Sequence, residues 1–453
     1  MSMPKGIPYI IGNELAERFS YYGMKTILTV FMTKYLMDSA GNLDVMTEEE
    51  SKTYYHLFVS ANYFFPILGA LLSDILWGKY RTIIVLSIVY CLGHIALSLD
   101  ETRLGLSLGL TMIAIGSGGI KPCVSANVGD QFDESNKSLL PRVFNYFYLS
   151  INLGAFASSL LTPILLRQFG PSVAFGIPGA LMILATIIFW LGKSKYKVNP
   201  PVGWKKYKND VFSKEGLEAL KSLTIIYLFL AVFWSLYEQT GSSWVLQALD
   251  PHMIKRFNVF GFSFEILPDQ VQALNPVLVL ILVPFMDAIG YPLISKVFPL
   301  TSLRKISIGM FICALSFVIV AYMQINLSAG KDISILWQCL AYVILTLSEV
   351  MVYGTGLEFS YTQAPLSMKS LIMGFFLLSI SLGSLFTAGI NWFIQNPDKT
   401  SKLEGPSYFW FFVILMTVTS MLFIIVAYYY KEKAYVRTSE DRIVDTDRGV
   451  QEE

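Results

Sequence analysis

Ionisable side chains form a stripe near the start of the sequence, in a stretch that is otherwise apolar. Glu14, Arg18 and Lys25 recur at intervals of four and seven residues, which places them on one face of a helix, and Glu17 lies beside that face. One guanidinium cannot neutralise two carboxylates, so either glutamate could bind and release a proton. The alternative is a structural ion pair that only holds neighbouring helices together.

Three more ionisable residues stand in apolar stretches far from this stripe. Lys121 precedes Pro122 in a glycine-rich stretch, where the glycines permit close helix packing and the proline frees a backbone carbonyl. Glu238 and Glu349 lie in the second half of the chain, and we expect both to be unpaired. If both sets face one cavity, cations line one wall and carboxylates the other, which suits a zwitterion such as a short peptide.

Histidines and uncharged polar residues give weaker signals. His56 is the histidine best placed for a proton path, because histidine titrates near neutrality, although a lone membrane histidine is more often a packed, hydrogen-bonded residue. His94 stands in an apolar stretch and His252 in a predicted loop. Other polar residues in apolar stretches, which often only hydrogen-bond neighbouring helices, are Asn62, Tyr63, Asn145, Tyr148, Asn152, Gln272 and Asn275.

The composition indicates that membrane helices position these residues. Hydrophobic residues make up 54% of the 453 and charged residues 15%, a balance too apolar for an ordinary soluble domain. A bilayer core requires roughly 20 mostly apolar residues per helix, and a charge buried there costs about 2.5 to 3.5 kcal/mol unless its site is paired or wet. Twelve such stretches lie at residues 7–37, 53–76, 80–99, 104–126, 142–167, 172–192, 221–250, 268–292, 303–323, 333–358, 368–394 and 405–430.

The distribution of basic residues predicts the topology. Eight of the 34 lysines and arginines lie between Lys193 and Lys221, and positively charged connections stay on the cytoplasmic side. Both termini are therefore expected in the cytoplasm, in a plasma or inner membrane. The predicted units are a six-helix bundle over 1–192, a cytoplasmic linker over 193–220, a second six-helix bundle over 221–430 and a cytoplasmic tail over 431–453.

The connection between the second and third predicted helices carries a recognisable charge pattern. Asp74 lies at a helix end, and Gly78 then makes a tight turn before Lys79 and Arg81. The run resembles the loop signature of the major facilitator superfamily, in which the turn and its charges hold the cytoplasmic ends of neighbouring helices. The three charged residues are thus expected to serve a gate or a structural role.

Several segments together resemble the proton-coupled oligopeptide transporter family of that superfamily, over residues 7 to about 430. The first helix matches the family pattern of two glutamates, an arginine and a tyrosine pair, and the fifth matches its signature. Other segments resemble most closely the animal di- and tripeptide carriers. The matching runs are Glu14–Gly23, Tyr55–Phe58, Gly118–Ala126, Gly129–Phe132, Phe147–Gly154 and Gly356–Pro365.

The resemblance implies an all-α fold of two six-helix bundles, alternating access, and symport of protons with di- and tripeptides or peptide-like drugs by a monomeric unit. It assigns proton coupling to Glu14, Glu17, Arg18, His56 and Glu238. The peptide carboxylate would bind Arg18, Lys25 and Lys121, and the amino group would bind Asn152, Asn275 and Glu349. Pockets for peptide side chains would be lined by Tyr22, Tyr63, Tyr148 and Trp234.

The sequence departs from the family pattern at three places. The connection at 324–332 is too short for the large extracellular domain of animal members, and the 193–220 linker lacks the helix pair common in bacterial ones, which points to a microbial source. Glu238 and Ser243 replace the aspartate and arginine of the animal pattern, so an ion pair with Asp287 is doubtful.

The same residues leave two other functions as alternatives. A proton-coupled carrier of nitrate or another small anion could use Arg18, Lys25 and Lys121 alone, but Glu349 would repel a simple anion. A membrane enzyme would need a nucleophile with its base, or a clustered metal site, and the sequence shows neither. We expect no metal and no cofactor other than the coupling protons. The net charge of +1 indicates no nucleic-acid partner, and the four cysteines, which all fall in predicted helices, suggest no disulfide framework.

Overall fold

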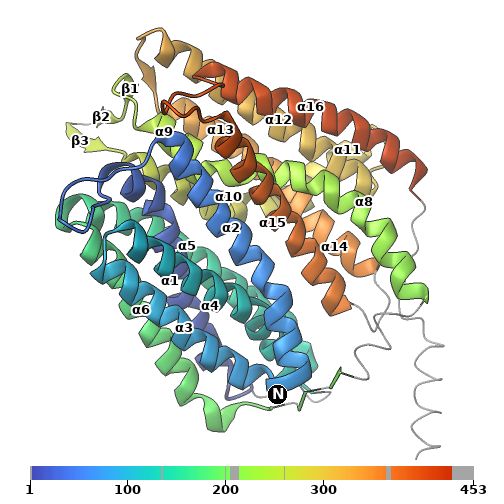
Figure 1. Cartoon of the computed structure of the whole chain (residues 1–453). Helices are drawn as coiled ribbons and strands as arrows, with labels where there is room; N and C mark the ends of the chain where they lie inside the picture. The colour runs from blue at the N-terminus through green and yellow to red at the C-terminus, as the bar shows by residue number, and fades with distance from the viewer. Residues whose placement is uncertain are drawn as a thin grey trace, which may run out of the picture.

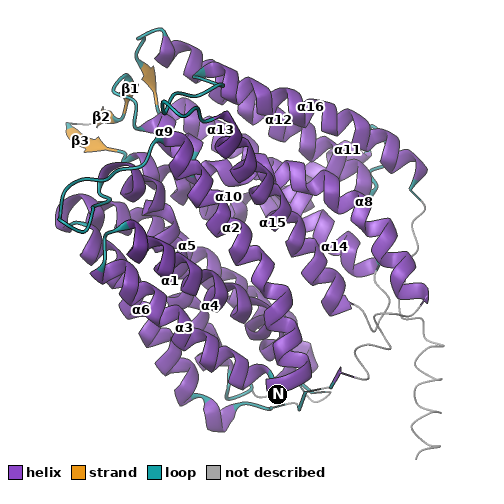
Figure 2. Ribbon diagram, viewed as in Figure 1, coloured by secondary structure: helices purple, strands orange, loops and turns teal. Residues whose placement is uncertain are grey.

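The computed structural model describes residues 3–133, 136–198, 200–201, 203–204, 214–259, 261–363 and 369–430. Long helices dominate these residues (Figure 2). The first half comprises α1 (Ile7–Lys34), α2 (Glu48–Leu71) with a π-helical extension η1 (Leu72–Trp77), α3 (Lys79–Leu99), α4 (Arg103–Asp130), η2 (Lys137–Leu139), α5 (Leu140–Phe169), α6 (Pro171–Leu191) and η3 (Lys193–Lys195).

Several helices of the second half are interrupted. One continuous segment comprises α8 (Lys214–Tyr237), η4 (Glu238–Gly241) and α9 (Ser243–Ala248), and the next comprises η5 (Pro268–Ala273), α10 (Leu274–Phe285), η6 (Met286–Gly290) and α11 (Tyr291–Ser295). They are followed by α12 (Ser302–Ser328), the segment α13 (Leu336–Glu349), η7 (Val350–Gly354) and α14 (Thr355–Thr362), then α15 (Lys369–Ile394) and α16 (Pro406–Tyr429).

Four short strands lie in the described connections of the second half. β2 (Arg256–Val259) and β3 (Phe262–Glu265) form an antiparallel hairpin. β1 (Met253–Ile254) pairs in parallel with β4 (Ile333–Ser334). The strands β1, β2 and β3 gather at one end of the molecule and the N-terminus lies at the other (Figure 1). These ends are called the strand side and the terminus side below.

Eleven of the described helical segments are long and apolar enough to cross a membrane. The helix missing from that set is α1, because the polar stripe predicted there lowers its hydropathy. With 28 residues it is about 42 Å long, more than a bilayer core requires. The predicted all-α class with twelve spanning helices is therefore confirmed, and the chain is a multi-pass membrane protein.

Some predicted helix boundaries are wrong, because charged helix ends extend beyond the apolar stretch. α2 begins at Glu48, ahead of the predicted residue 53, because the Thr47 side chain caps three glutamates that hydropathy does not register. α8 begins at Lys214, ahead of the predicted 221. Much of the predicted 193–220 linker, and all of the 431–453 tail, lie outside the described residues.

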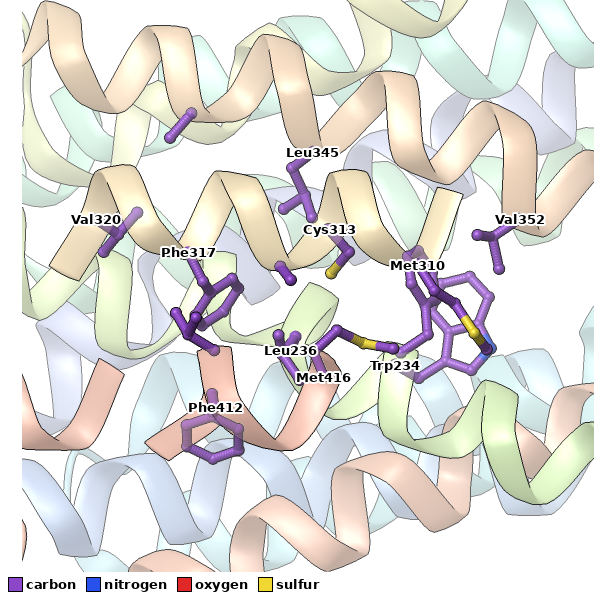
Figure 3. Packing of buried hydrophobic residues seen from close by; sticks show 14 of the residues in the cluster. Trp234, Leu236, Met310, Cys313, Phe317, Val320, Leu345, Val352, Phe412 and Met416 are labelled. Atoms are coloured by element: carbon purple, nitrogen blue, oxygen red, sulfur yellow. The ribbon is translucent and has the colours of Figure 1, made fainter. Parts of the chain in front are cut away.

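Each half has its own hydrophobic core. One cluster runs from Ile7 to Tyr196 and the other from Ala219 to Phe423. In the second, side chains of α12 such as Phe317 lie between Leu345 of α13 and Phe412 of α16 (Figure 3). The halves meet where α2 packs along α15, α5 against α10 and η5, and α1 against α9.

Close helix packing at the glycine-rich stretch of α4 agrees with the sequence interpretation. A Cβ atom on Gly69 of α2 would collide with the backbone of Gly119 of α4, and one on Gly118 would lie 2.7 Å from the carbonyl oxygen of Asn62. The backbones of α2 and α4 therefore approach each other closely, which fixes the position of Lys121 relative to α2.

Candidate functional site

Glu14, Glu17 and Arg18 of the α1 stripe are buried and paired with one another. Arg18 Nε lies 3.2 Å from Glu14 Oε1 and is in direct contact with the Glu17 carboxylate. Glu17 is 1% exposed, and the hydroxyl of Ser117 on α4 donates a hydrogen bond to it over 3.4 Å. Two carboxylates thus share one guanidinium, as the sequence suggested. One carboxylate could therefore accept a proton while the other stays paired with Arg18.

A second ion pair joins the two halves. Lys25 Nζ of α1 lies 2.7 Å from Glu238 Oε2 of η4, and both side chains are buried. The expectation that Glu238 is unpaired is therefore wrong. The spacing within each helix could not reveal the pair, because its members come from different halves that meet only in the fold.

Lys121 lies between aromatic rings. Its Nζ is 4.3 Å from the ring centroid of Tyr63 and 4.7 Å from that of Tyr21. Among the described residues no carboxylate lies within ion-pair distance of this amine. Cation–π contacts stabilise the ammonium while leaving its hydrogen-bond donors available to an anion.

On the opposite half, Glu349 ends α13 and Asn275 lies near the start of α10. The Asn275 side-chain amide donates to Glu349 Oε2 over 2.7 Å and to Thr346 Oγ1 over 3.3 Å. The structure thus brings these two predicted residues together. Asn152 is not part of this contact, because its amide donates to the Tyr148 carbonyl of its own helix over 2.9 Å.

The aromatic residues proposed from the sequence lie in different environments. Trp234 is 3% exposed and forms part of the second hydrophobic core, near Met310 (Figure 3). Its ring packs edge-on against Tyr353 of η7 at 5.6 Å. Tyr148 is 42% exposed, and the ring of Tyr22 lies 5.3 Å from that of Tyr21. Sequence reasoning did not assign a role to Tyr353, although its position four residues after Glu349 was a signal.

His56 joins the halves on the strand side of this region. It is 0% exposed, and its Nε2 lies 2.9 Å from the Ser242 hydroxyl. Its Nδ1 has no hydrogen-bond partner among the described residues. Ser242 was missed from the sequence; the signal was its place four residues after Glu238.

Further contacts close the strand side between the halves. Thr29 of α1 donates to the carbonyl of Gly241 over 2.6 Å, and the hydroxyls of Ser60 and Ser381 lie 3.0 Å apart. A Cβ on Gly241 would collide with the Tyr55 hydroxyl, so only glycine fits between the two halves here. The strand side is therefore tightly closed.

Exposed polar residues lie toward the terminus side of both halves. Asn145 and Tyr148 are exposed on α5, and Glu358 is exposed on α14. A carboxylate within a spanning helix cannot face lipid without a large desolvation cost. We therefore expect the face of α14 that carries Glu358 to contact water.

The charged residues of the α2–α3 connection also lie on the terminus side. Gly78 has a φ of 74° and makes the turn. Lys79 Nζ lies 2.5 Å from Asp130 Oδ2 at the end of α4, whereas the Arg81 guanidinium lies 5.7 Å from the Trp77 ring. Asp74 lies in η1. The contacts of Lys79 and Arg81 hold the ends of three helices together.

In the described part of the chain, no three His, Cys, Asp or Glu side chains lie close enough together to form a metal site.

Comparison with known proteins supports one family. The model of the POT family, PTR2, matches residues 80–214 and 204–411. Solute carrier family 15 member 2 of Mus musculus is 39% identical over 377 residues, which cover 72% of this chain and 50% of the relative. Solute carrier family 15 member 1 of Rattus norvegicus is 36% identical over 384 residues, which cover 72% of this chain and 52% of the relative. The chain spans about half the length of these relatives.

Solved structures agree over almost the whole chain. The crystal structure of an auto-inhibited POT family peptide transporter superposes with a TM-score of 0.86 at 32% identity, covering 96% of this chain and 99% of that one. A proton-dependent oligopeptide family transporter gives 0.75 at 36% identity, covering 92% and 100%. The architecture is that of the major facilitator superfamily. Within it, this chain belongs to the POT family, as the motifs indicated.

Proposed function

We propose that this protein imports di- and tripeptides by proton-coupled symport with alternating access. The observation that carries the proposal is the arrangement of charge: Lys121 and the Arg18 cluster line one half, and the Asn275–Glu349 pair lines the other. An extended dipeptide carries opposite charges at its two ends, so the two walls complement it. The two solved structures named above, a peptide transporter and a proton-dependent oligopeptide family transporter by name, support the same substrate class.

Each end of the peptide would find a defined partner. The free donors of Lys121 and the neighbouring Arg18 would bind the carboxylate, and Lys25 would join them when its contact with Glu238 opens. Glu349 would accept the amino group, with Asn275 fixing the orientation of its carboxylate. Asn152 would assist there only after leaving its present hydrogen bond. Tyr22, Tyr63, Tyr148 and Trp234 would contact peptide side chains without polar selection, which favours broad specificity.

Proton coupling would use the buried charge clusters. A proton on Glu14 or Glu17 would release Arg18 toward the peptide carboxylate, and loss of that proton would restore the ion pair. A proton on His56 would change its contact with Ser242, which closes the strand side together with Lys25 and Glu238. No cofactor other than the protons is required, and one chain would form the transport unit.

The membrane placement follows from the basic residues of the connections. We propose that the terminus side is cytoplasmic and the strand side extracellular, in the plasma or inner membrane, so that the structure is inward-facing. The two bundles, 1–192 and 221–430, would rock about the central site while the 193–220 linker and the 431–453 tail stay in the cytoplasm. Asp74, Lys79 and Arg81 would then hold the cytoplasmic ends of the first bundle together.

The test is uptake of radiolabelled dialanine into proteoliposomes, with and without an inward proton gradient and an inside-negative potential. Accumulation that requires the gradient and that unlabelled tripeptide inhibits supports the proposal. Uptake of nitrate without dialanine would support the anion carrier instead, and Glu349, held by Asn275 in the cavity wall, argues against that outcome. Hydrolysis of the dipeptide by purified protein would reopen the enzyme alternative.

A further inference from the structure

The connection between β3 and α10 reaches across the strand side to the other half with three polar side chains. Glu265 ends β3, and Gln270 and Gln272 lie in η5, all in the second half of the chain. Each contacts the first half: Glu265 through Arg167, Gln270 through the carbonyl of Leu160, and Gln272 through that of Thr26. These three residues are called the clasp below.

Both glutamines donate through their side-chain amides, and Gln270 is held in the orientation that its contact requires. The Gln270 side-chain oxygen accepts the backbone N–H of Leu267 over 3.0 Å, which directs its Nε2 toward the Leu160 carbonyl at 2.9 Å. Gln272 Nε2 donates to the Thr26 carbonyl over 3.1 Å. Both acceptors are main-chain oxygens of α5 and α1, so no substitution in those helices removes them.

Glu265, the acidic member of the clasp, forms ion pairs at the surface. Arg167 Nη1 of α5 lies 3.2 Å from Glu265 Oε2, and Arg256 Nε of the same hairpin lies 3.2 Å from the same oxygen. Two residues of the clasp, Glu265 and Gln270, border an open hollow whose other lining residues are Ile164, Arg167, Gln168 and Leu267. Water can therefore reach the contacts of Glu265 and Gln270 from the strand side and replace them, whereas the Gln272 contact lies at buried Thr26.

We propose that the clasp is the reversible lock of the extracellular gate: it stabilises the inward-facing state and releases α1 and α5 in each cycle. A helix carbonyl is already bonded within its helix, so the additional bond from a glutamine exchanges readily with water, as a lock that must open repeatedly requires. The inference rests on the proposed alternating access, but the lock itself can be tested without transport.

The test measures conformation in detergent or nanodiscs, without peptide. Spin labels at Leu99→Cys and Trp392→Cys, two exposed positions near the strand-side ends of α3 and α15, report the distance between the halves. Gln270→Leu and Gln272→Leu remove the donors while keeping a comparable size. We expect each to raise the outward-open population at least threefold, and both together more.

Matched controls separate the lock from general damage. Gln168→Leu alters a glutamine in the same hollow, and Arg256→Gln removes the partner of Glu265 that belongs to its own half. Neither should change the distances. Arg167→Glu and Glu265→Arg should each open the strand side, and the double charge swap should restore the closed distance.

Distances in both glutamine variants that match those of the unsubstituted protein would overturn the proposal, as would a charge swap that opens the gate further. Failure of the proposed function gives a different result. In that case dialanine uptake is absent from the unsubstituted protein while the distances still respond to the clasp variants.

Discussion

The Lys25–Glu238 pair should govern the closure of the strand side, and its contribution can be estimated from the structure. The charged atoms lie 2.7 Å apart, and their side chains are 12% and 4% exposed, so solvent screens them little. Removing one partner of a buried pair costs about 3 to 5 kcal/mol, because it leaves the other charge buried and uncompensated. Since about 1.4 kcal/mol is a factor of ten, Lys25→Met should shift the equilibrium toward the outward-open state by at least about 100-fold.

The double variant is the informative control. Replacing both residues by methionine removes the buried charges together, and such a replacement is often neutral or stabilising. We therefore expect Lys25→Met/Glu238→Met to stay within about 1 kcal/mol of the unsubstituted protein, whereas each single variant opens. The assay is the distance between spin labels on the strand-side ends of the two halves, recorded without peptide.

The reasoning would be refuted if the single and double variants opened to the same extent. That result would mean that the two side chains contribute independently, and that the pair, although short and buried, carries no coupling energy. It would also mean that the uncharged contacts, chiefly Thr29 with Gly241 and His56 with Ser242, hold the strand side closed.

Three further predictions concern the same closure. Gly241→Ala should open the strand side, because the added Cβ collides with the Tyr55 hydroxyl; unchanged label distances in that variant would contradict the packing argument. Lys52 Nζ of the first half lies 4.2 Å from the ring centroid of Tyr408 in the second half. Tyr408→Leu should therefore favour opening by about 0.5 to 2 kcal/mol, whereas Tyr408→Phe, which keeps the ring, should not. Equal effects of the two variants would show that the hydroxyl matters instead of the ring. Burial alone would raise the pKa of Glu265, but the hydrogen bonds and charges of Arg167 and Arg256 outweigh burial and lower this pKa below the usual 4.5. The contribution of the Glu265 carboxylate to closure is therefore lost only as the pH falls through that lowered pKa. Glu265→Gln should therefore shift the distances equally at pH 5.5 and 7.5, and an effect confined to the higher pH would disprove this assignment.

The sequence predicted most of the fold because apolar length and charge clusters are local properties. The α1 stripe was recognised from helical spacing alone, and Glu349 with Asn275 from motif resemblance; the structure places the latter two in contact. The start of α2 at Glu48 was missed because a capped acidic turn has no hydropathy signal.

Contacts between helices distant in sequence could not be predicted in the same way. The partner of Lys25 lies 213 residues away, in the other half of the chain. Lys79 likewise pairs with Asp130, which belongs to another helix and was noticed only as part of a motif. The clasp glutamines use backbone acceptors, and a carbonyl has no sequence signature.

The π-helical segments are placed differently in the two halves. In the second half, η6 interrupts the segment from α10 to α11 and η7 interrupts that from α13 to α14, whereas in the first half the π-helical turn η1 falls at the very end of α2. A π-turn holds its backbone with wider hydrogen-bonded loops, and such turns are joints where a helix can change direction. The portions α11 and α14 can therefore change direction relative to α10 and α13 at these turns, whereas the described helices of the first half carry no π-turn within their length.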